Sequence, residues 1–363
     1  MRQVGFNALG GINMRLTKLL QTTALAGLVG LTSMAIGSDA DAKVRWKMQS
    51  TFGSKLSILG ETGKHFENLV KELSGGDMNI KFFEPGALVP SLEGFDAAKA
   101  GSVDAVWGTA GYHAGKIPAM SLFTAVPFGP RASELLGWME YGGGAAIKDK
   151  VMDDNGLKAF NCGIIAPETS GWFKEPITST DQLKGLKMRF FGMGAKVMTK
   201  LGASTQLLSA ADIYPALERG VIQATEFSMP SIDKNLGFYQ IAKHNYFPGW
   251  HQQSSILELL MNKGKWEALN KQQQTIIKTA CDASIAWSLI RSDAIQADAM
   301  AWMQGKGVTL HDWSPEFIAK FKAGWDAVVK EEVAKDPLFA TAYASYSAFR
   351  TKYKVWGDRA YLK

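Results

Sequence analysis

Residues 185–227 constrain the fold most strongly, because they alternate between strand-like and helix-like patterns. The apolar run 186–191 (LKMRFF) lies between two glycines, which is typical of a short buried strand. Two helical segments follow, and each ends at a glycine that fits a helix C-terminus, Gly202 and Gly220. Residues 221–227 are again β-branched and aromatic. The stretch therefore predicts strand, helix, extended link, helix and strand, as in an α/β fold.

Arg189 lies inside the first of these predicted strands. Burying an arginine without a partner is costly, so its position calls for an explanation. One interpretation is a structural ion pair, or a side chain that reaches the surface. The other is a planar guanidinium that binds the carboxylate of a ligand. Glu226, at the end of the last strand, lies where binding sites form in open α/β sheets. The pattern alone leaves both interpretations open.

The first 42 residues have the features of a secretory signal peptide. Basic residues precede the apolar, small-residue segment 19–37, and Ala40-Asp41-Ala42 predicts cleavage before Lys43. A membrane anchor is the alternative, but glutamine, threonine and glycine residues interrupt the apolar run. Met14 is an alternative start that gives a leader of ordinary length. No later run is long enough to span a bilayer, so we expect a periplasmic protein with its signal peptide removed.

Composition excludes several classes of function. The net charge of +6 is mild, and no basic stripe with interleaved aromatics is present, which argues against a nucleic-acid partner. The five histidines lack zinc spacing, and neither a phosphate-binding loop nor a GxSxG motif occurs. Cys162 and Cys281 permit a disulfide in an exported chain. They lie in a strand-like and a helix-like pattern, so we expect two independent buried thiols.

The chain after the leader is long enough for two domains. Strand-like segments at 44–49, 78–83 and 102–107 alternate with helical segments at 57–73 and 90–100, which predicts a mostly parallel sheet. The helix–glycine–strand pattern that ends this first unit recurs at the end of the 185–227 stretch. Two similar α/β halves are what a two-lobed clamp would contain.

The second half of the chain adds three further expectations. Residues 246–253 are aromatic and broken by proline and glycine, which predicts an irregular crossover wall. Residues 270–306 have the periodicity of one long amphipathic helix. Residues 314–361 are helical and rich in aromatic residues, a pattern that usually marks core and is here also a candidate partner face.

Several motifs resemble the solute-binding subunits of TRAP transporters, most closely the branch that binds 2-oxo acids or lactate. The stretch 183–189 (LKGLKMR) is specific to the superfamily, and Gly-Phe-Tyr at 237–239 with Pro-Gly-Trp-His at 248–251 is specific to the branch. Matching segments also occur at 126–130 (VPFGP), 171–173 (GWF) and 213–217 (IYPAL). The resemblance covers nearly the whole chain after the leader.

The resemblance implies an α/β fold of the two-lobed periplasmic-binding-protein type. Each lobe would be a mixed, mostly parallel sheet flanked by helices, with long helices at the C-terminus. Lobe I would comprise residues 43–166 and 255–295. Lobe II would comprise residues 167–254 and 296–363, including a C-terminal helical extension.

The resemblance also implies a ligand site and a cation site. Arg189 matches the family's signature arginine, which holds the ligand carboxylate. Glu168, Glu226 and the carbonyl of Phe227 match the branch's cation site, although the branch usually has Gln in place of Glu168 and Trp in place of Phe227. The predicted substrate-binding residues are Arg189, Glu168, Tyr112, Trp172, Phe227, Trp250 and Gln252. The predicted ligands of a sodium or calcium ion are Glu168, Glu226, Phe227 and Gln252.

Three functions are compatible with these features. The first, which the resemblance favours, is a receptor that binds a small monocarboxylate, such as pyruvate or a lactate-like 2-hydroxy acid, and delivers it to a membrane permease. The second is a secreted hydrolase or lyase with Glu168 and Glu226 as an acid–base pair. The third is a structural or adhesion protein. Because no nucleophile, base and orienting group occur together, we expect a receptor and no enzyme. The resemblance also predicts a homodimer formed through the C-terminal helices.

Overall fold

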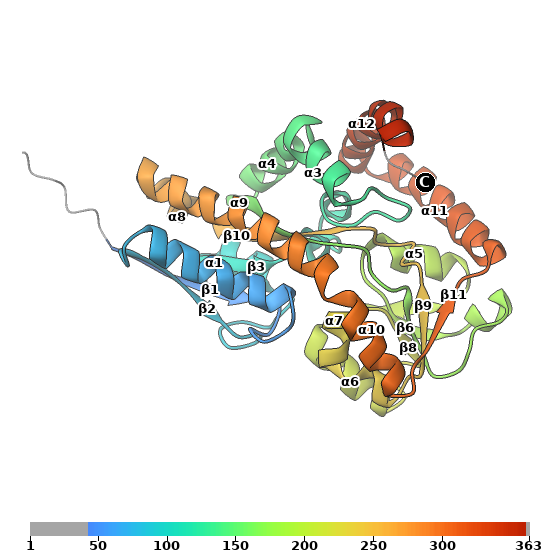
Figure 1. The fold of residues 1–363 in the computed structure, drawn as a ribbon. Coiled ribbons are helices and arrows are strands. Elements are labelled where there is room, and N and C mark those ends of the chain that lie inside the picture. Colours follow the sequence, from blue (N-terminus) through green and yellow to red (C-terminus); the bar gives the residue numbers. More distant parts are fainter. Residues whose placement is uncertain (1–42, 361–363) are drawn as a thin grey trace, which may run out of the picture. The chain divides into compact units, whose positions relative to one another are not determined.

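Two mixed β-sheets form the frame of the protein (Figure 1). The computed structural model describes residues 43–360. The predicted signal peptide therefore lies outside the described residues. Among the helices within residues 43–360, none is both long enough and apolar enough to cross a membrane.

The first sheet is built from the N-terminal half of the described chain and one later strand. Its strands are β1 (Val44–Ser50), β2 (Met78–Phe83), β3 (Ala105–Gly108), β4 (Leu157–Ile165) and β10 (Ser255–Asn262). Their order is β2-β1-β3-β10-β4. β1 pairs in parallel with β2 and β3, whereas β10 runs antiparallel to β3 and β4. The three parallel strands are those that the alternating strand and helix pattern predicts.

The second sheet has the order β11-β9-β5-β8-β6-β7. Its strands are β5 (Gly171–Phe173), β6 (Lys187–Arg189), β7 (Ser204–Gln206), β8 (Ala224–Thr225), β9 (His244–Phe247) and β11 (Thr309–Asp312). β6 pairs in parallel with β7 and β8, and β5 runs antiparallel to β8 and β9. Both sheets are therefore mixed.

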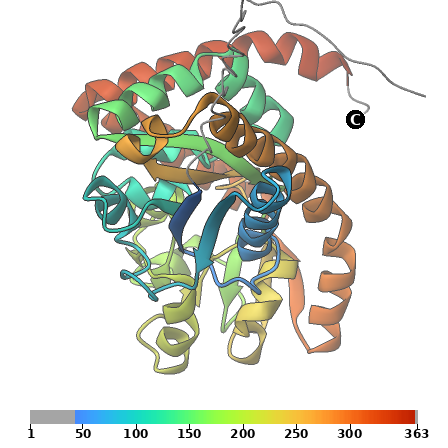
Figure 2. The ribbon, with the colours of Figure 1, turned by 90° about the vertical axis from the view of Figure 1, so that its left-hand side faces the viewer.

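Helices pack on both sheets (Figures 1 and 2). The α-helices are α1 (Leu59–Leu73), α2 (Gly94–Lys99), α3 (Ala132–Tyr141), α4 (Gly144–Asp154), α5 (Gly192–Lys200), α6 (Ala210–Glu218), α7 (Pro230–Asp233), α8 (Lys263–Glu267), α9 (Lys271–Ala294), α10 (Gln296–Gly305), α11 (Pro315–Lys335) and α12 (Pro337–Ala360). Short 3-10 helices are η1 (Ala110–His113), η2 (Pro118–Phe123), η3 (Thr180–Leu183), η4 (Lys234–Leu236) and η5 (Phe238–Gln240). α11 packs on α5, whereas α12 packs on α11 and on α3, α4 and η2.

The stretch 185–227 forms the predicted succession of elements: β6, α5, the short strand β7, α6 and β8. Gly202 and Gly220 follow the two helices with φ of +95° and +71°, a conformation that favours glycine. Because β6 and β8 are parallel neighbours with Arg189 opposite Thr225, their C-terminal ends meet. This pairing brings Arg189 beside Glu226.

Two predictions about the second half of the chain are wrong in detail. Residues 270–306 form two helices that meet at Ile295, because α9 packs along β4 and α1 while α10 turns to pack on α7. The crossover at 246–253 begins as a regular strand, since β9 pairs with both β5 and β11.

The expectation of two independent thiols is also wrong. Cys162 of β4 and Cys281 of α9 form a disulfide across a sequence separation of 119 residues. α9 lies along β4, which brings the two side chains together. A cross-link that closes such a long loop stabilises a protein by about 2–5 kcal/mol, largely by constraining the unfolded chain.

Candidate functional site

Arg189 and Glu226 form a buried ion pair where β6 and β8 end. Nη1 of Arg189 lies 2.8 Å from Oε1 of Glu226 and donates a second hydrogen bond to the backbone carbonyl of Glu226 at 2.6 Å. Nε of Arg189 donates to the carbonyl of Leu208. Each of the two charged side chains is only 1% exposed. The ring of Phe227 covers the guanidinium, with its centroid 5.0 Å from Cζ. This structure thus contains the structural ion pair that was one of the two interpretations of Arg189.

Glu168 is brought to this ion pair by a close approach of two loops. The backbone N–H of Gly249 donates to the carbonyl of Glu168, and a Cβ at position 249 would lie 2.4 Å from that oxygen. Only glycine allows this contact, and it carries the following residues, His251 and Gln252, against Glu168. Nε2 of Gln252 donates a hydrogen bond to Oε1 of Glu168.

His251 lies between the two glutamates. Its Nε2 is 3.3 Å from Oε2 of Glu168 and 3.6 Å from Oε2 of Glu226. These three atoms are buried and have no well-directed hydrogen bond. One ligand atom from each of the three residues lies within 4.8 Å of the others, so the cluster could hold a metal ion. Buried polar atoms are rarely left without well-directed hydrogen bonds, which makes this cluster a candidate binding centre.

The charges of the cluster depend on one another. Burial lowers the pKa of His251, but its contacts with the carboxylates of Glu168 and Glu226 outweigh burial and raise that pKa to about 9. Burial raises the pKa of Glu168 to about 7, even though His251 opposes the shift. Burial also acts to raise the pKa of Glu226, but the charges of Arg189 and His251 prevail and hold it below its usual range. At neutral pH the cluster therefore contains two cations, Arg189 and His251.

Trp172 and Trp250, both predicted to wall the ligand cleft, do not line the cavity that adjoins this cluster. Trp172 is buried, packs on Phe238 and donates from Nε1 to Oδ2 of Asp233 at 2.7 Å. Burial, together with the charges of Glu168 and Glu226, raises the pKa of Asp233 well above its usual range. Trp250 stacks on Phe321 with ring centroids 4.5 Å apart. Both tryptophans pack in the core behind the charged cluster.

A cavity of about 30 Å³ opens onto the cluster and is lined by both sheets and their loops. Its walls are Phe52, Leu59, Thr109, Tyr112, Ile165, Glu168, Arg189, Phe191, Phe227, Ser228, Gln252, Ser255 and Leu257. Arg189, Glu168, Tyr112, Phe227 and Gln252, all predicted site residues, meet here. Glu226 belongs to the cluster through its ion pair with Arg189. Burial raises the pKa of Tyr112 to about 12 although Arg189 opposes the shift, so its hydroxyl is neutral.

Sequence reasoning missed His251 as a member of the site. The signal was present, since His251 ends the Pro-Gly-Trp-His run and precedes Gln252, which was predicted. It also missed Thr109, Phe191 and Ser228, whose sequence surroundings carry no chemical signal. Their roles follow only from packing between segments that are distant in the chain.

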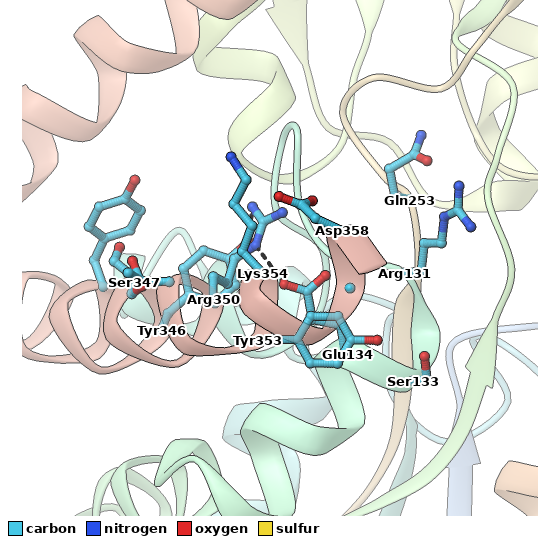
Figure 3. A pocket seen from close by; sticks show the side chains of 14 residues that line it. Arg131, Ser133, Glu134, Gln253, Tyr346, Ser347, Arg350, Tyr353, Lys354 and Asp358 are labelled. Carbon is cyan, nitrogen blue, oxygen red and sulfur yellow. Dashed lines mark hydrogen bonds and ion pairs between the residues drawn. The ribbon is translucent and has the colours of Figure 1, made fainter. Parts of the chain in front are cut away.

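A larger cavity of about 730 Å³ lies elsewhere, between α3 and α12 (Figure 3). Arg350 of α12 forms an ion pair with Glu134 of α3 at 3.0 Å and donates to the carbonyl of Phe128. Most of the lining residues that Figure 3 labels belong to α12, whereas Ser133 and Glu134 belong to α3 and Arg131 and Gln253 lie outside both helices. None of the predicted ligand or cation residues lines it. The smaller cavity, with its buried charges, is therefore the candidate site.

The chain is similar to known solute-binding proteins. The family described as "bacterial extracellular solute-binding protein, family 7" matches residues 49–336. A monocarboxylate 2-oxoacid-binding periplasmic protein of Nostoc sp. is 34% identical over 92% of this chain and 92% of its own length.

Solved structures of TRAP transporter solute-binding proteins share the fold. One from Bordetella bronchiseptica, described as a mixed-occupancy dimer with copurified calcium and picolinate in one site and an apo second site, has a TM-score of 0.86 at 29% identity, covering 88% of this chain and 95% of that chain. One from Pseudoalteromonas atlantica with bound sodium and pyruvate has a TM-score of 0.84 at 29% identity, covering 88% of this chain and 97% of that chain. These matches confirm the two-lobed α/β fold class and the resemblance drawn from the sequence. This chain belongs to the extracellular solute-binding protein family 7, the solute-binding proteins of TRAP transporters.

Proposed function

We propose that this protein is an extracytoplasmic receptor for a small monocarboxylate, a 2-oxo acid such as pyruvate or a lactate-like 2-hydroxy acid. It binds the acid together with a cation and delivers it to the membrane permease of a TRAP transporter. The observation that carries this proposal is a buried arginine that lines a small cavity beside buried carboxyl oxygens without hydrogen-bond partners. The 2-oxoacid-binding relative and the pyruvate-bound neighbour support the choice of ligand.

Arg189 is the residue that we assign to the ligand carboxylate. It already donates to Glu226, and a planar guanidinium has further donors for a second carboxylate in the cavity. The neutral hydroxyl of Tyr112 and the amide of Gln252 supply polar contacts for the rest of the acid. The aromatic rings of Phe191 and Phe227 limit the cavity to a short carbon chain.

The cation is assigned to Glu168, Glu226, the carbonyl of Phe227 and the side chain of Gln252. Oε2 of Glu168 and Oε2 of Glu226 both face Nε2 of His251 and accept no well-directed hydrogen bond, so the carboxylates offer a hard cation oxygen ligands with His251 beside them. When bound, the ion would neutralise the carboxylates and attract the oxygens of the acid. Two carboxylates favour calcium over sodium, and similar proteins are known with either ion.

His251 alters the balance of charge at the proposed cation site. The ligand carboxylate, Glu168 and Glu226 carry three negative charges. Arg189 alone would leave two of them uncompensated. The imidazolium of His251 supplies a second positive charge between the two glutamates. With both glutamates ionised, one excess negative charge remains. Because the imidazolium and the cation would face the same carboxylate oxygens, binding of the ion would displace the proton of His251.

The receptor would work by closing two lobes around the acid. We propose the lobe boundaries expected from the sequence, 43–166 with 255–295 and 167–254 with 296–363. The strands of the two sheets divide in this way, and α12 also contacts α3 and α4 of the first group. Secretion across the inner membrane with removal of the signal peptide before Lys43 belongs to the same proposal, as does docking onto the permease.

A thermal-shift screen tests the function directly. The protein is freed of metal, then heated with short 2-oxo, 2-hydroxy and unsubstituted acids, each with no added cation, with Na⁺ and with Ca²⁺. A ligand that binds only the folded state at a hundredfold excess over Kd stabilises it by about 2.7 kcal/mol. We expect such a shift for pyruvate or lactate and for no long-chain acid. Recovery of the acid unchanged after incubation separates this receptor from a hydrolase or lyase that uses Glu168 and Glu226.

A further inference from the structure

A second buried charged cluster lies close to the candidate site and is not part of it. Glu258 of β10 is 1% exposed. Its Oε1 lies 3.1 Å from Nε2 of His113, and its Oε2 lies 2.8 Å from Nζ of Lys148. Nζ of Lys148 also donates to Oδ1 of Asn161 on β4. None of these side chains lines the ligand cavity.

The sequence neighbours of this cluster do line the cavity. Tyr112 precedes His113 in η1, and Leu257 precedes Glu258 in β10. Successive side chains of a strand point to opposite faces, so Leu257 faces the cavity while Glu258 is directed away from it. The cluster is therefore joined to the cavity wall through the backbone of η1 and β10.

The short turn η1 is fastened to β10 at both of its ends. At its start, Oγ1 of Thr109 donates to the carbonyl of Ile256 at 2.9 Å. At its end, His113 contacts Glu258. Tyr112 lies between these anchors. A four-residue 3-10 helix has few internal hydrogen bonds, so these side-chain contacts act together with its packing on η2 to fix its position.

The position of η1 determines how Tyr112 packs against Phe191 across the cavity. A Cβ at Gly111 would lie 2.2 Å from the ring of Phe191, so this ring packs directly on the backbone of η1. Tyr112 itself packs edge-on against Phe191, with ring centroids 5.1 Å apart, and its hydroxyl interacts with Arg189. Tyr112 lines this small cavity, so a displacement of Tyr112 would change the shape of the cavity.

We propose that His113, Glu258 and Lys148 form a positioning cluster, which holds η1 so that Tyr112 is placed to contact the bound acid and to limit its size. Lys148 keeps the Glu258 carboxylate ionised and oriented, and Glu258 anchors His113. The three residues act through Tyr112 and do not touch the ligand. The inference rests on the proposed function, because it takes the cavity as the site of the acid.

The test removes the anchor without leaving a charge unpaired. His113→Leu abolishes the contact with Glu258, which stays paired with Lys148. His113→Gln is the conservative variant, because its amide can still donate to Glu258. His311→Leu is the matched control, since His311 is a partly buried histidine that contacts His244 of the second sheet at 2.9 Å.

The first readout is hydrogen exchange of the segment 109–117, which needs no ligand. We expect exchange to quicken by about tenfold in His113→Leu, the lower end of what losing a hydrogen bond to a buried charge costs. His113→Gln should restore protection, and His311→Leu should leave this segment unchanged. Unaltered exchange in His113→Leu would overturn the proposal whatever the protein binds. If His113→Leu does not fold, His113→Asn, whose amide is too short to reach Glu258, replaces it.

The second readout is calorimetric binding of pyruvate in a double-mutant cycle with Tyr112→Phe. His113→Leu should weaken binding about tenfold when Tyr112 is present and less than about twofold in Tyr112→Phe, because coupled residues do not act additively. The same variant should lose discrimination against 4-methyl-2-oxopentanoate, a longer 2-oxo acid. An equal loss of pyruvate affinity with Tyr112 and with Tyr112→Phe would overturn the proposal, because His113 would then have a merely structural role. Failure of the wild type to bind any 2-oxo acid would instead refute the proposed function, and hydrogen exchange would then decide on the anchor.

Discussion

At the scale of single residues, we propose that Arg189 serves two partners. Its ion pair with Glu226 is complete in this structure and buried from water. A ligand carboxylate would add a second anion to the same guanidinium. The charges of Arg189 and His251 would then offset the cost of gathering three carboxylates in one poorly hydrated place.

Replacing Arg189 should abolish tight binding. Arg189→Ala should weaken binding of pyruvate by about 2–5 kcal/mol, the usual cost of truncating one partner of a buried charge pair. Arg189→Lys should also bind poorly, because an ammonium group cannot form the planar, two-pronged contact. Titration calorimetry measures the affinity, and Arg291→Lys, which alters a surface pair with Glu61, is the control. Near-native affinity in Arg189→Ala would rule out this assignment.

Glu168 should determine which cation binds. Glu168→Gln removes one negative charge, restores the residue usual in the branch, and keeps an oxygen for the ion. We expect the variant to bind pyruvate with Na⁺ and to lose its preference for Ca²⁺, because fewer carboxylates favour a monovalent ion. Competition between the two ions, followed by calorimetry, gives the preference. An unchanged preference for Ca²⁺ would show that the charge at position 168 does not select the ion.

At the scale of elements, β10 links the first sheet to the site. It carries Ser255 and Leu257 on the cavity wall and Glu258 in the buried cluster with Lys148 and His113. Burial alone would raise the pKa of Glu258, but the charge of Lys148 and the contact with His113 lower it to about 2. An acid that titrates lower in the folded state than in the unfolded chain stabilises the fold above its unfolded pKa.

Glu258 should therefore make stability depend on pH in acid. Its contribution is fully present above about pH 4.5, the ordinary value for glutamate, and is lost as the pH falls towards about 2. A shift of this size corresponds to roughly 3 kcal/mol of unfolding free energy. Urea unfolding of the wild type and of Glu258→Gln from pH 5 to 2 measures it. The difference in unfolding free energy between the two proteins should shrink as the pH falls. A difference that stays constant with pH would contradict the buried ion pair of Glu258 with Lys148.

Local sequence pattern predicted the order of strands and helices around Arg189 and Glu226. Periodicity and glycine positions determine such elements, and parallel pairing of β6 with β8 then brings the two residues together. The pattern could not show that Trp172 and Trp250 pack in the core, because aromatic residues occur alike in cores and cavity walls. It could not show the Cys162–Cys281 disulfide, since that pairing depends on how α9 packs along β4.

At the scale of the whole molecule, α12 separates into a packed part and an exposed part. Phe339 and Tyr346 are buried against the rest of the chain, whereas Val355 and Trp356 are 65% and 64% exposed near its end. In the aromatic tail, which was predicted as core or as a partner face, Phe339 and Tyr346 are thus core, whereas the other aromatic side chains are partly or fully exposed. Its last turns remain the part that could contact a second copy.

We predict a homodimer that uses these last turns of α12. A related solute-binding protein is described as a dimer. Light scattering at micromolar concentration should give twice the monomer mass, and Trp356→Glu should shift the equilibrium towards monomer by placing a charge in an apolar contact. Tyr141→Glu, which alters another exposed aromatic residue on α3, should leave the mass unchanged. A monomeric mass for the wild type would refute the dimer.

We propose that a short 2-oxo acid and a cation bind together at the Arg189 cluster. The test is calorimetric titration of pyruvate into protein that has been stripped of metal by exhaustive chelation. The titration is done in sodium-free buffer and then repeated with Ca²⁺ or Na⁺ restored. We predict weak or no binding without a cation, and tight one-to-one binding once Ca²⁺ is added. Undiminished affinity without any metal would contradict the cation site, and absence of binding under every condition would contradict the receptor.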